Sequence, residues 1–172
     1  GLSLTVFFDQ RKGSASTADL DPASIETTIE QACAIARYTE ADPYAGLADA
    51  ERMATKFPDL DQWHPWEINA DEAIDIALRC EQAGRDLDPR ISNSDGASLS
   101  SGRSLSVYAN SHGFIGRERG SSHSLSCALI AGRDEAMQRD YWYTASCHPD
   151  ELQDAATVGR RAAERAIARL QP

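Results

Sequence analysis

The segment Leu125-Ser126-Cys127-Ala128-Leu129-Ile130-Ala131 decides the fold class of this chain. Its larger apolar residues fall at alternate positions, the two-residue period of a β-strand with one face against a core. The same alternation occurs on both sides of it, at Leu105, Val107, Ala109, Tyr141 and Tyr143. Turn-forming groups that contain glycine separate these segments, at 95–96, 101–102, 111–113 and 132–134. From Arg90 to Ser146 the sequence therefore predicts four or five consecutive strands in an antiparallel meander.

Two helices precede the meander. An Asp-Pro pair at 21–22 opens the first, because aspartate is a favoured N-cap and proline is tolerated at the first helical position; this helix ends near Tyr38. The second begins at Asn69, with Glu72 placed as in a capping box, and Gly84 is predicted to be its C-cap.

A third helix is predicted over 149–170, and alternating residues at 2–8 with a following turn indicate an N-terminal hairpin. Because helices and antiparallel strands are segregated, the fold class is α+β: an antiparallel β-meander with segregated helices, plus a small N-terminal hairpin-helix unit. We expect two domains. Residues 1–68 form a partial N-terminal α/β domain with a Pro-rich connector, and residues 69–172 form a middle α+β domain of helix, antiparallel strands and helix.

The connector at 39–70 is predicted to be irregular, since proline and glycine interrupt it repeatedly. It also holds Tyr44, Trp63 and Trp66. Aromatic side chains bury large apolar areas, so we expect the connector to be packed against a domain rather than solvated.

Charge and composition exclude several function classes. The net charge is −10, which disfavours contact with phosphate backbones and anionic lipid, so neither direct nucleic-acid binding nor membrane binding is expected. No apolar run approaches the roughly 20 residues that span a bilayer.

The four cysteines show no C-x-x-C spacing and indicate a reducing, cytoplasmic compartment. The N-terminus lacks the basic region of a signal peptide, and both ends are expected to be cuts through a longer protein.

Motifs for catalysis are absent from the sequence. There is no phosphate-binding glycine loop, no G-x-S-x-G and no H-E-x-x-H. The histidines are isolated, at 64, 112, 123 and 148. Serine precedes histidine at 111–112 and 122–123, but neighbours on a strand point to opposite faces. We therefore predict no catalytic residue and no metal site in this stretch.

Three consecutive aromatic residues end the segment Arg139-Asp140-Tyr141-Trp142-Tyr143. In a strand, Tyr141 and Tyr143 share one face and Trp142 takes the other. Two interpretations stay open. Either the strand is buried on both sides, or one aromatic face, with Asp140 or Arg139, is available to a partner or a peptide.

Five blocks carry a resemblance to a known family. They are RKGSAST at 11–17 with Asp19-Leu20, IARYT at 35–39 leading into 42–49, PDLD at 58–61, NSHGF at 110–114 and RDYWY at 139–143. In this order they resemble the PmbA/TldE subunit of the TldD/PmbA family over essentially the whole chain, without the family's first strand and helix or its C-terminal domain. The candidate interface or peptide-binding residues are Arg139, Asp140, Tyr141, Trp142, Tyr143, Asn110 and His112.

The resemblance implies a heterodimeric protease. A TldD-like catalytic subunit would carry zinc on a His-Glu-x-x-x-His helix, and the PmbA-type subunit would be its required partner. The assembly would trim peptides or unfolded proteins, among them microcin precursors and an antitoxin. No catalytic residue of the family maps onto this stretch, so no cofactor is expected here and zinc is expected in the partner subunit.

Three functional hypotheses follow. The first is a non-catalytic part of a PmbA/TldE-like subunit that partners the zinc-bearing subunit in peptide proteolysis. The second is an acidic regulatory binding module acting on DNA gyrase or its inhibitors, in line with the older family label "modulator of DNA gyrase". Its acids are spread along the chain rather than laid out in a regular ladder, which is typical of an ordinary soluble surface. The third is that the parent chain cleaves alone.

Overall fold

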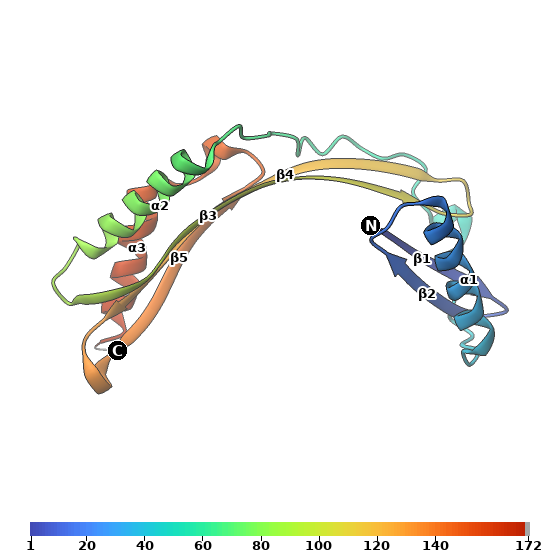
Figure 1. The fold of residues 1–172 in the computed structure, drawn as a ribbon, viewed down its shortest axis with the longest axis horizontal. Coiled ribbons are helices and arrows are strands. Elements are labelled where there is room, and N and C mark those ends of the chain that lie inside the picture. The colour runs from blue at the N-terminus through green and yellow to red at the C-terminus, as the bar shows by residue number, and fades with distance from the viewer. Residues whose placement is uncertain (171–172) are drawn as a thin grey trace. The chain divides into compact units, whose positions relative to one another are not determined.

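The structure, a computed structural model, describes residues 1–170 and divides into two compact units, 1–55 and Lys56 onward. In the first unit, β1 (Leu2–Phe8) pairs antiparallel with β2 (Arg11–Thr17), and α1 (Pro22–Tyr38) packs on this hairpin (Figure 1). A short 3-10 turn, Ala50–Arg52, follows α1. The hairpin and the helix predicted over 22–38 are both confirmed.

The second unit is one antiparallel sheet with two helices. Its strands β3 (Ile91–Ala109), β4 (Ile115–Ala131) and β5 (Gln138–Ser146) pair in the order β3-β4-β5. The helices α2 (Ala70–Arg85) and α3 (Ala155–Ala168) pack on each other and on the sheet (Figure 1). Short 3-10 turns lie at Asp134–Ala136 and Pro149–Glu151. The α+β class with an antiparallel meander is therefore confirmed.

The prediction of four or five strands in the meander is wrong, because within residues 1–170 it has three. Gly102 continues the ladder opposite Ser122, so no turn forms there. At Gly96, whose φ is +99°, a register shift marks a β-bulge instead of a reversal. The sequence N-S-x-G occurs twice, at 93–96 and 110–113, and only the second, which ends at Gly113, forms a hairpin turn. Glycine marks both places because each needs an unusual φ, and the sequence does not say whether the chain turns back.

Two helix boundaries also differ from the prediction. The capping box of Asn69 and Glu72 is present. Gly84, however, lies inside α2 and is buried, and Asp86 is the C-cap. The last helix begins at Ala155, where Asp154 accepts a hydrogen bond from the Thr157 amide, and not at Pro149.

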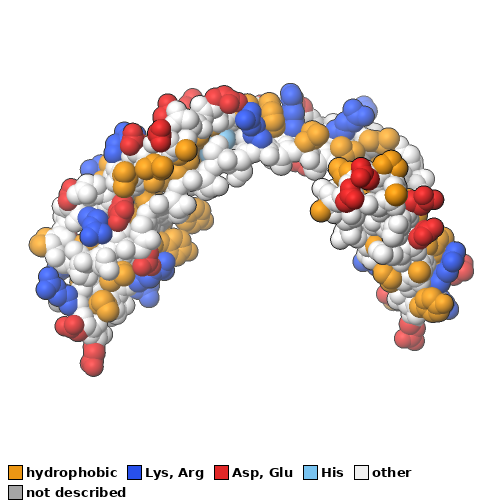
Figure 2. All heavy atoms as spheres, viewed as in Figure 1, with side chains coloured by type: hydrophobic (Ala, Val, Ile, Leu, Met, Phe, Trp, Pro, Cys, Tyr) orange, Lys and Arg blue, Asp and Glu red, His pale blue; other side chains and the backbone are white. Residues whose placement is uncertain are grey.

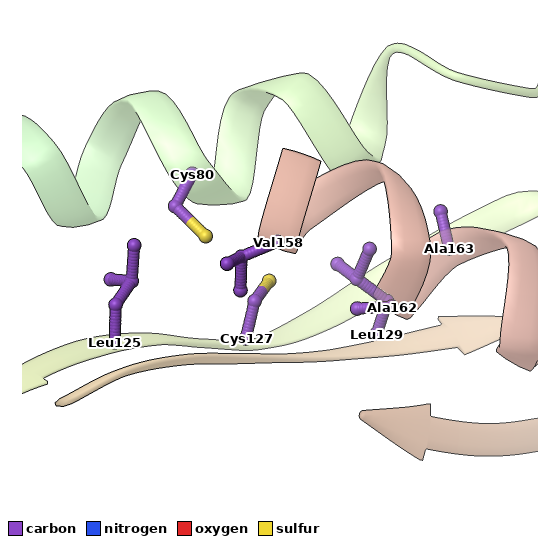
Figure 3. Close-up of a cluster of buried hydrophobic side chains, with 7 residues drawn as sticks. All are labelled: Cys80, Leu125, Cys127, Leu129, Val158, Ala162 and Ala163. Atoms are coloured by element: carbon purple, nitrogen blue, oxygen red, sulfur yellow. The ribbon is translucent and has the colours of Figure 1, made fainter. Parts of the chain in front are cut away.

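The core of the second unit lies between the two helices and one face of the sheet (Figure 3). Its buried members are Cys80, Leu125, Cys127, Leu129, Val158, Ala162 and Ala163. Alternate residues of the segment 125–131 thus form the inner face of β4, against α2 and α3.

A hydrogen bond with Cys127 and burial both raise the pKa of the Cys80 thiol. Cys80 and Cys127 are buried free thiols, whereas Cys33 and Cys147 are only half-buried.

Over residues 1–170, none of the helices combines the length and the apolar character that crossing a membrane requires.

Candidate peptide-docking and interface surfaces

The face of β5 that points away from the helices carries two exposed tyrosines. Tyr141 is 51% exposed and Tyr143 is 56% exposed, and their rings stack with centroids 6.3 Å apart. Arg139 lies on the same face and forms an ion pair with Asp95. We call Arg139, Tyr141 and Tyr143 the tyrosine face. Exposed neighbouring aromatic rings are typical of contact surfaces, since they offer large apolar area at low conformational cost.

A shallow cavity of about 290 Å³ adjoins the tyrosine face. Small side chains from β3 and β4, Ser98, Ser126 and Ala128, line it together with Tyr141 and Arg139. Because these side chains are short, a bound chain could approach the backbone of the sheet closely while it packs against the tyrosine ring.

Trp142 points to the opposite face, as the alternation predicts, and packs against the core. Its indole nitrogen donates to Gln153 Oε1 at 3.1 Å. The guanidinium groups of Arg161 and Arg165 lie 5.1 and 5.6 Å from the ring centroid. Such cation–π contacts hold α3 against β5. The structure therefore gives Trp142 an internal packing position.

Asp140 is buried on the same inner face, with 8% exposure. Its carboxylate accepts hydrogen bonds from Arg165 Nε at 3.2 Å, from an Arg169 guanidinium nitrogen at 3.4 Å and from the Tyr141 amide at 2.8 Å. Burial raises the pKa of this carboxyl, but the Tyr141 amide and the two arginines outweigh burial, so its pKa lies below the ordinary value. Of the two charged candidates, only Arg139 is exposed.

We expect Asp140→Asn to lower the free energy of unfolding by about 1–3 kcal/mol at pH 7, because it removes a buried charged acceptor. A lowered folded-state pKa stabilises the fold above the unfolded-state pKa of about 4, and this contribution disappears as the pH falls through the folded-state value. The stability gap between wild type and variant should therefore narrow below about pH 4. Urea titrations at several pH values measure it, and a gap that stays constant with pH would contradict this role.

Asn110 and His112 lie at the β3–β4 turn. Asn110 Oδ1 accepts hydrogen bonds from the His112 amide at 3.0 Å and the Phe114 amide at 3.4 Å, which stabilises the turn. Tyr143 pairs with Ser126 of β4. Ser126 lies eleven residues after Ile115, where β4 begins at the turn, so roughly 35 Å of strand separates the turn from Tyr143. The structure therefore does not bring the candidate residues into one site.

The connector packs along β4 beyond the end of β5. The Ser121 amide donates to Gln62 O at 2.8 Å, and the Ser121 hydroxyl accepts from the His64 amide at 2.8 Å. Arg119 lies over the Trp63 ring, 5.2 Å from its centroid, and Trp66 meets His123 edge-on. Packing of both tryptophans is therefore confirmed. Tyr44, in contrast, is 94% exposed, so the prediction that it packs against a domain is wrong.

His123 forms a buried polar network that the sequence did not indicate. Its ring has no exposed surface, and Nε2 lies 2.9 Å from the His64 carbonyl oxygen. A carbonyl only accepts, so Nε2 donates this hydrogen bond, and Nδ1 is hydrogen-bonded to the Ser101 hydroxyl at 3.0 Å. Both ring nitrogens are thereby satisfied, and the network ties the connector to the sheet. The histidine and serine lie 22 residues apart, so no local motif marks them.

A groove of about 370 Å³ runs between the connector and β4. Residues 57–63 form one wall and residues 117–119 the other. Throughout the part of the chain that is described, no group of three or more His, Cys, Asp or Glu side chains is placed to hold a metal ion.

Comparison with known proteins identifies the family. The profile of the PmbA/TldA metallopeptidase central domain matches residues 63–170, and that of PmbA/TldA metallopeptidase domain 1 matches residues 1–36. The chain is 45% identical over 171 residues to the metalloprotease PmbA of Escherichia coli O157:H7 and 43% identical over 171 residues to a PmbA homologue of Haemophilus influenzae. Each alignment covers 99% of this chain.

A solved structure from Bacteroides thetaiotaomicron, whose description names a modulator of DNA gyrase, superimposes with a TM-score of 0.83 at 30% identity. This match covers 96% of the chain and 38% of the Bacteroides protein. The chain likewise spans 38% of the length of both curated relatives. The two profiles, the identities and the shared fold together place this chain in the PmbA/TldA metallopeptidase family.

Proposed function

We propose that this chain is a non-catalytic, docking part of a PmbA/TldE-like subunit, which partners a zinc-bearing TldD-like subunit in peptide proteolysis. The tyrosine face is the observation that carries the proposal. Stacked, exposed aromatic rings beside a cavity lined by small side chains suit the apolar side chains and extended backbone of a peptide or unfolded protein.

The free edge of β5 supports the same proposal. In the described sheet β5 pairs only with β4, so its second edge is open to an added strand. Extended peptides bind in this way, since backbone hydrogen bonds give affinity with little demand on sequence. A peptide paired with β5 would lie beside Tyr141 and Tyr143.

The described residues, 1–170, do not offer a zinc site. No set of three or more candidate ligands converges within residues 1–170, so we assign these residues no metal chemistry. The proposal places zinc in the partner subunit and gives this chain substrate and partner contacts alone. The free cysteines support a reducing, cytoplasmic setting for the complex.

We expect Tyr141→Ala combined with Tyr143→Ala, in the full-length protein with its catalytic partner, to raise the KM for a peptide substrate at least about tenfold with kcat little changed. Removing two aromatic contacts weakens binding, whereas the reacting groups lie elsewhere. Steady-state cleavage and co-elution of the two subunits measure the effect. Tyr44→Ala is the matched control, because Tyr44 is exposed but belongs to the other unit. Wild-type cleavage and wild-type assembly in the double variant would disprove the proposal.

The gyrase hypothesis keeps one supporting observation, the description of the Bacteroides protein. A pull-down with the full-length protein separates the two functions. A co-purifying zinc-bearing subunit supports the docking role, and co-purifying gyrase supports the regulatory one.

A further inference from the structure

Two cysteines from different elements meet in the core of the second unit. Cys80 belongs to α2 and Cys127 to β4, and their sulfur atoms are turned toward each other (Figure 3). The two residues are 0% and 1% exposed, and their thiols share a hydrogen bond. Hydrogen-bonded thiols that face each other are close to the arrangement that a disulfide bond needs.

The backbone on both sides of the pair holds this arrangement. The Cys80 carbonyl oxygen lies against α3, so closely that a Cβ on Gly159 would be 1.9 Å from it. Cys127 is in the middle of the sheet, where it pairs with Ala97 of β3 and Trp142 of β5. All of these residues belong to the second unit, so the cysteine pair is formed and buried within that unit.

The two thiols differ in chemical character. The hydrogen bond with Cys80 lowers the pKa of the Cys127 thiol, although burial and Glu81 raise it. The same hydrogen bond and burial raise the pKa of the Cys80 thiol. Because the thiolate is the nucleophile in thiol oxidation, Cys127 suits the attacking role and Cys80 the resolving role.

Small neutral reagents have a path to this pair. Cys127 lines the cavity of about 290 Å³ beside the tyrosine face, together with Gly96 and Ser98. A water molecule takes up about 30 Å³, so the cavity admits molecules of a few atoms. Acidic side chains are distributed over the visible surface (Figure 2), and the net charge of −10 repels anionic oxidants such as glutathione disulfide. Hydrogen peroxide is small and neutral.

We propose that Cys80 and Cys127 form a reversible disulfide bond, which ties α2 to β4, when the protein meets hydrogen peroxide. The Cys127 thiolate attacks one peroxide oxygen and the O–O bond breaks, which gives a sulfenic acid and a hydroxide. The proton that Cys127 released converts this hydroxide to water. The Cys80 sulfur then attacks the sulfenic sulfur, the S–S bond forms, and the hydroxyl group leaves as water with the Cys80 proton. Two thiols are oxidised to one disulfide, and one peroxide is reduced to two water molecules.

The bond would make the stability of the second unit depend on oxidation. It closes a loop of about 47 residues, which restricts the unfolded chain and opposes separation of α2 from the sheet. We expect the buried amides of α2 to exchange hydrogen at least about tenfold more slowly in the oxidised protein. This modification does not depend on the docking function proposed above.

Mass spectrometry of the full-length protein tests the proposal. The folded protein is treated with hydrogen peroxide, and the remaining free thiols are then alkylated in denaturant. Digestion should yield two peptides joined through Cys80 and Cys127, lighter by two hydrogen atoms than the reduced pair. Dithiothreitol should separate them, and hydrogen exchange of α2 should return to the rate of the untreated protein. Because the wild-type protein is mapped, this measurement requires no substitution in the core.

Cys33→Ala with Cys147→Ala is the matched control, since it removes the two half-buried thiols and keeps the buried pair. We expect this variant to form the same bond with the same slowing of exchange. Adding Cys80→Ala should abolish both, while circular dichroism verifies the fold. Oxidation confined to Cys33 and Cys147, conversion of the buried pair to sulfinic acids, a bond that forms only after unfolding, or a bond that leaves exchange in α2 unchanged would each overturn the proposal.

Discussion

Gly159→Ala is expected to lower the free energy of unfolding of the unit from Lys56 onward by about 3 kcal/mol or more. A Cβ at this position would lie 1.9 Å from the Cys80 carbonyl oxygen and 2.9 Å from its carbon. Gly84 of α2 lies against Gly159 of α3 in the same close approach of the two helices, since a Cβ on Gly84 would lie 2.6 Å from the Gly159 carbonyl oxygen. The obstructing atoms are backbone, so relief requires α2 and α3 to separate, which opens the core around Val158.

Urea or thermal unfolding followed by circular dichroism measures this effect. Gly102→Ala is the matched control, because Gly102 is in the same unit and a Cβ there meets nothing within 4 Å. We expect the control to change stability by no more than about 0.5 kcal/mol. Equal stabilities of the two variants would show that the helices do not depend on the glycine contact.

Gly13→Ala should unfold the first unit selectively. A Cβ on Gly13 would lie 2.0 Å from the Ala32 carbonyl oxygen and 2.5 Å from the Ala36 nitrogen, both in the backbone of α1. The hairpin then cannot pack on the helix, and Ala32 and Ala36, both fully buried, lose their cover. Because residues 1–55 form a compact unit by themselves, we expect the second unit to keep its structure.

Amide hydrogen exchange resolved by segment distinguishes the two units. Loss of protection in β1, β2 and α1, with unchanged protection in β4 and α3, is the expected pattern. Gly46→Ala is the control in the same unit, since a Cβ there has no neighbour within 4 Å. Equal loss of protection in both units would contradict their independence.

Local patterns predicted the elements that depend on near neighbours. The capping box of Asn69 and Glu72 closes over three residues, and the alternation at 125–131 needs only one strand and one buried face. The opposite orientations of Trp142 and Tyr143 follow from the same alternation. None of these features requires knowledge of a distant segment.

Predictions that depended on a distant partner were less successful. Gly84 is typical of a C-cap by its place near a helix end, yet its role is set by contact with Gly159, 75 residues further along the chain. Gly102 is typical of a turn, yet it pairs with Ser122 and β3 continues through it. Asp140 and Tyr141 are neighbours in the sequence but have different surroundings. Asp140 is buried and forms ion pairs with Arg165 and Arg169. Tyr141 points to the other face of the strand and is exposed.

The sequence alone thus determined the α+β class, the hairpin-helix start and the presence of antiparallel strands, because each rests on residue patterns within single segments. It also determined the likeness to a metallopeptidase family, which rests on the order of five blocks along the chain. The tertiary structure decided which tyrosines are exposed, which carboxylate is buried and where the connector packs. These properties arise when segments far apart in the chain meet, since burial and pairing are properties of both surfaces in contact and not of either one.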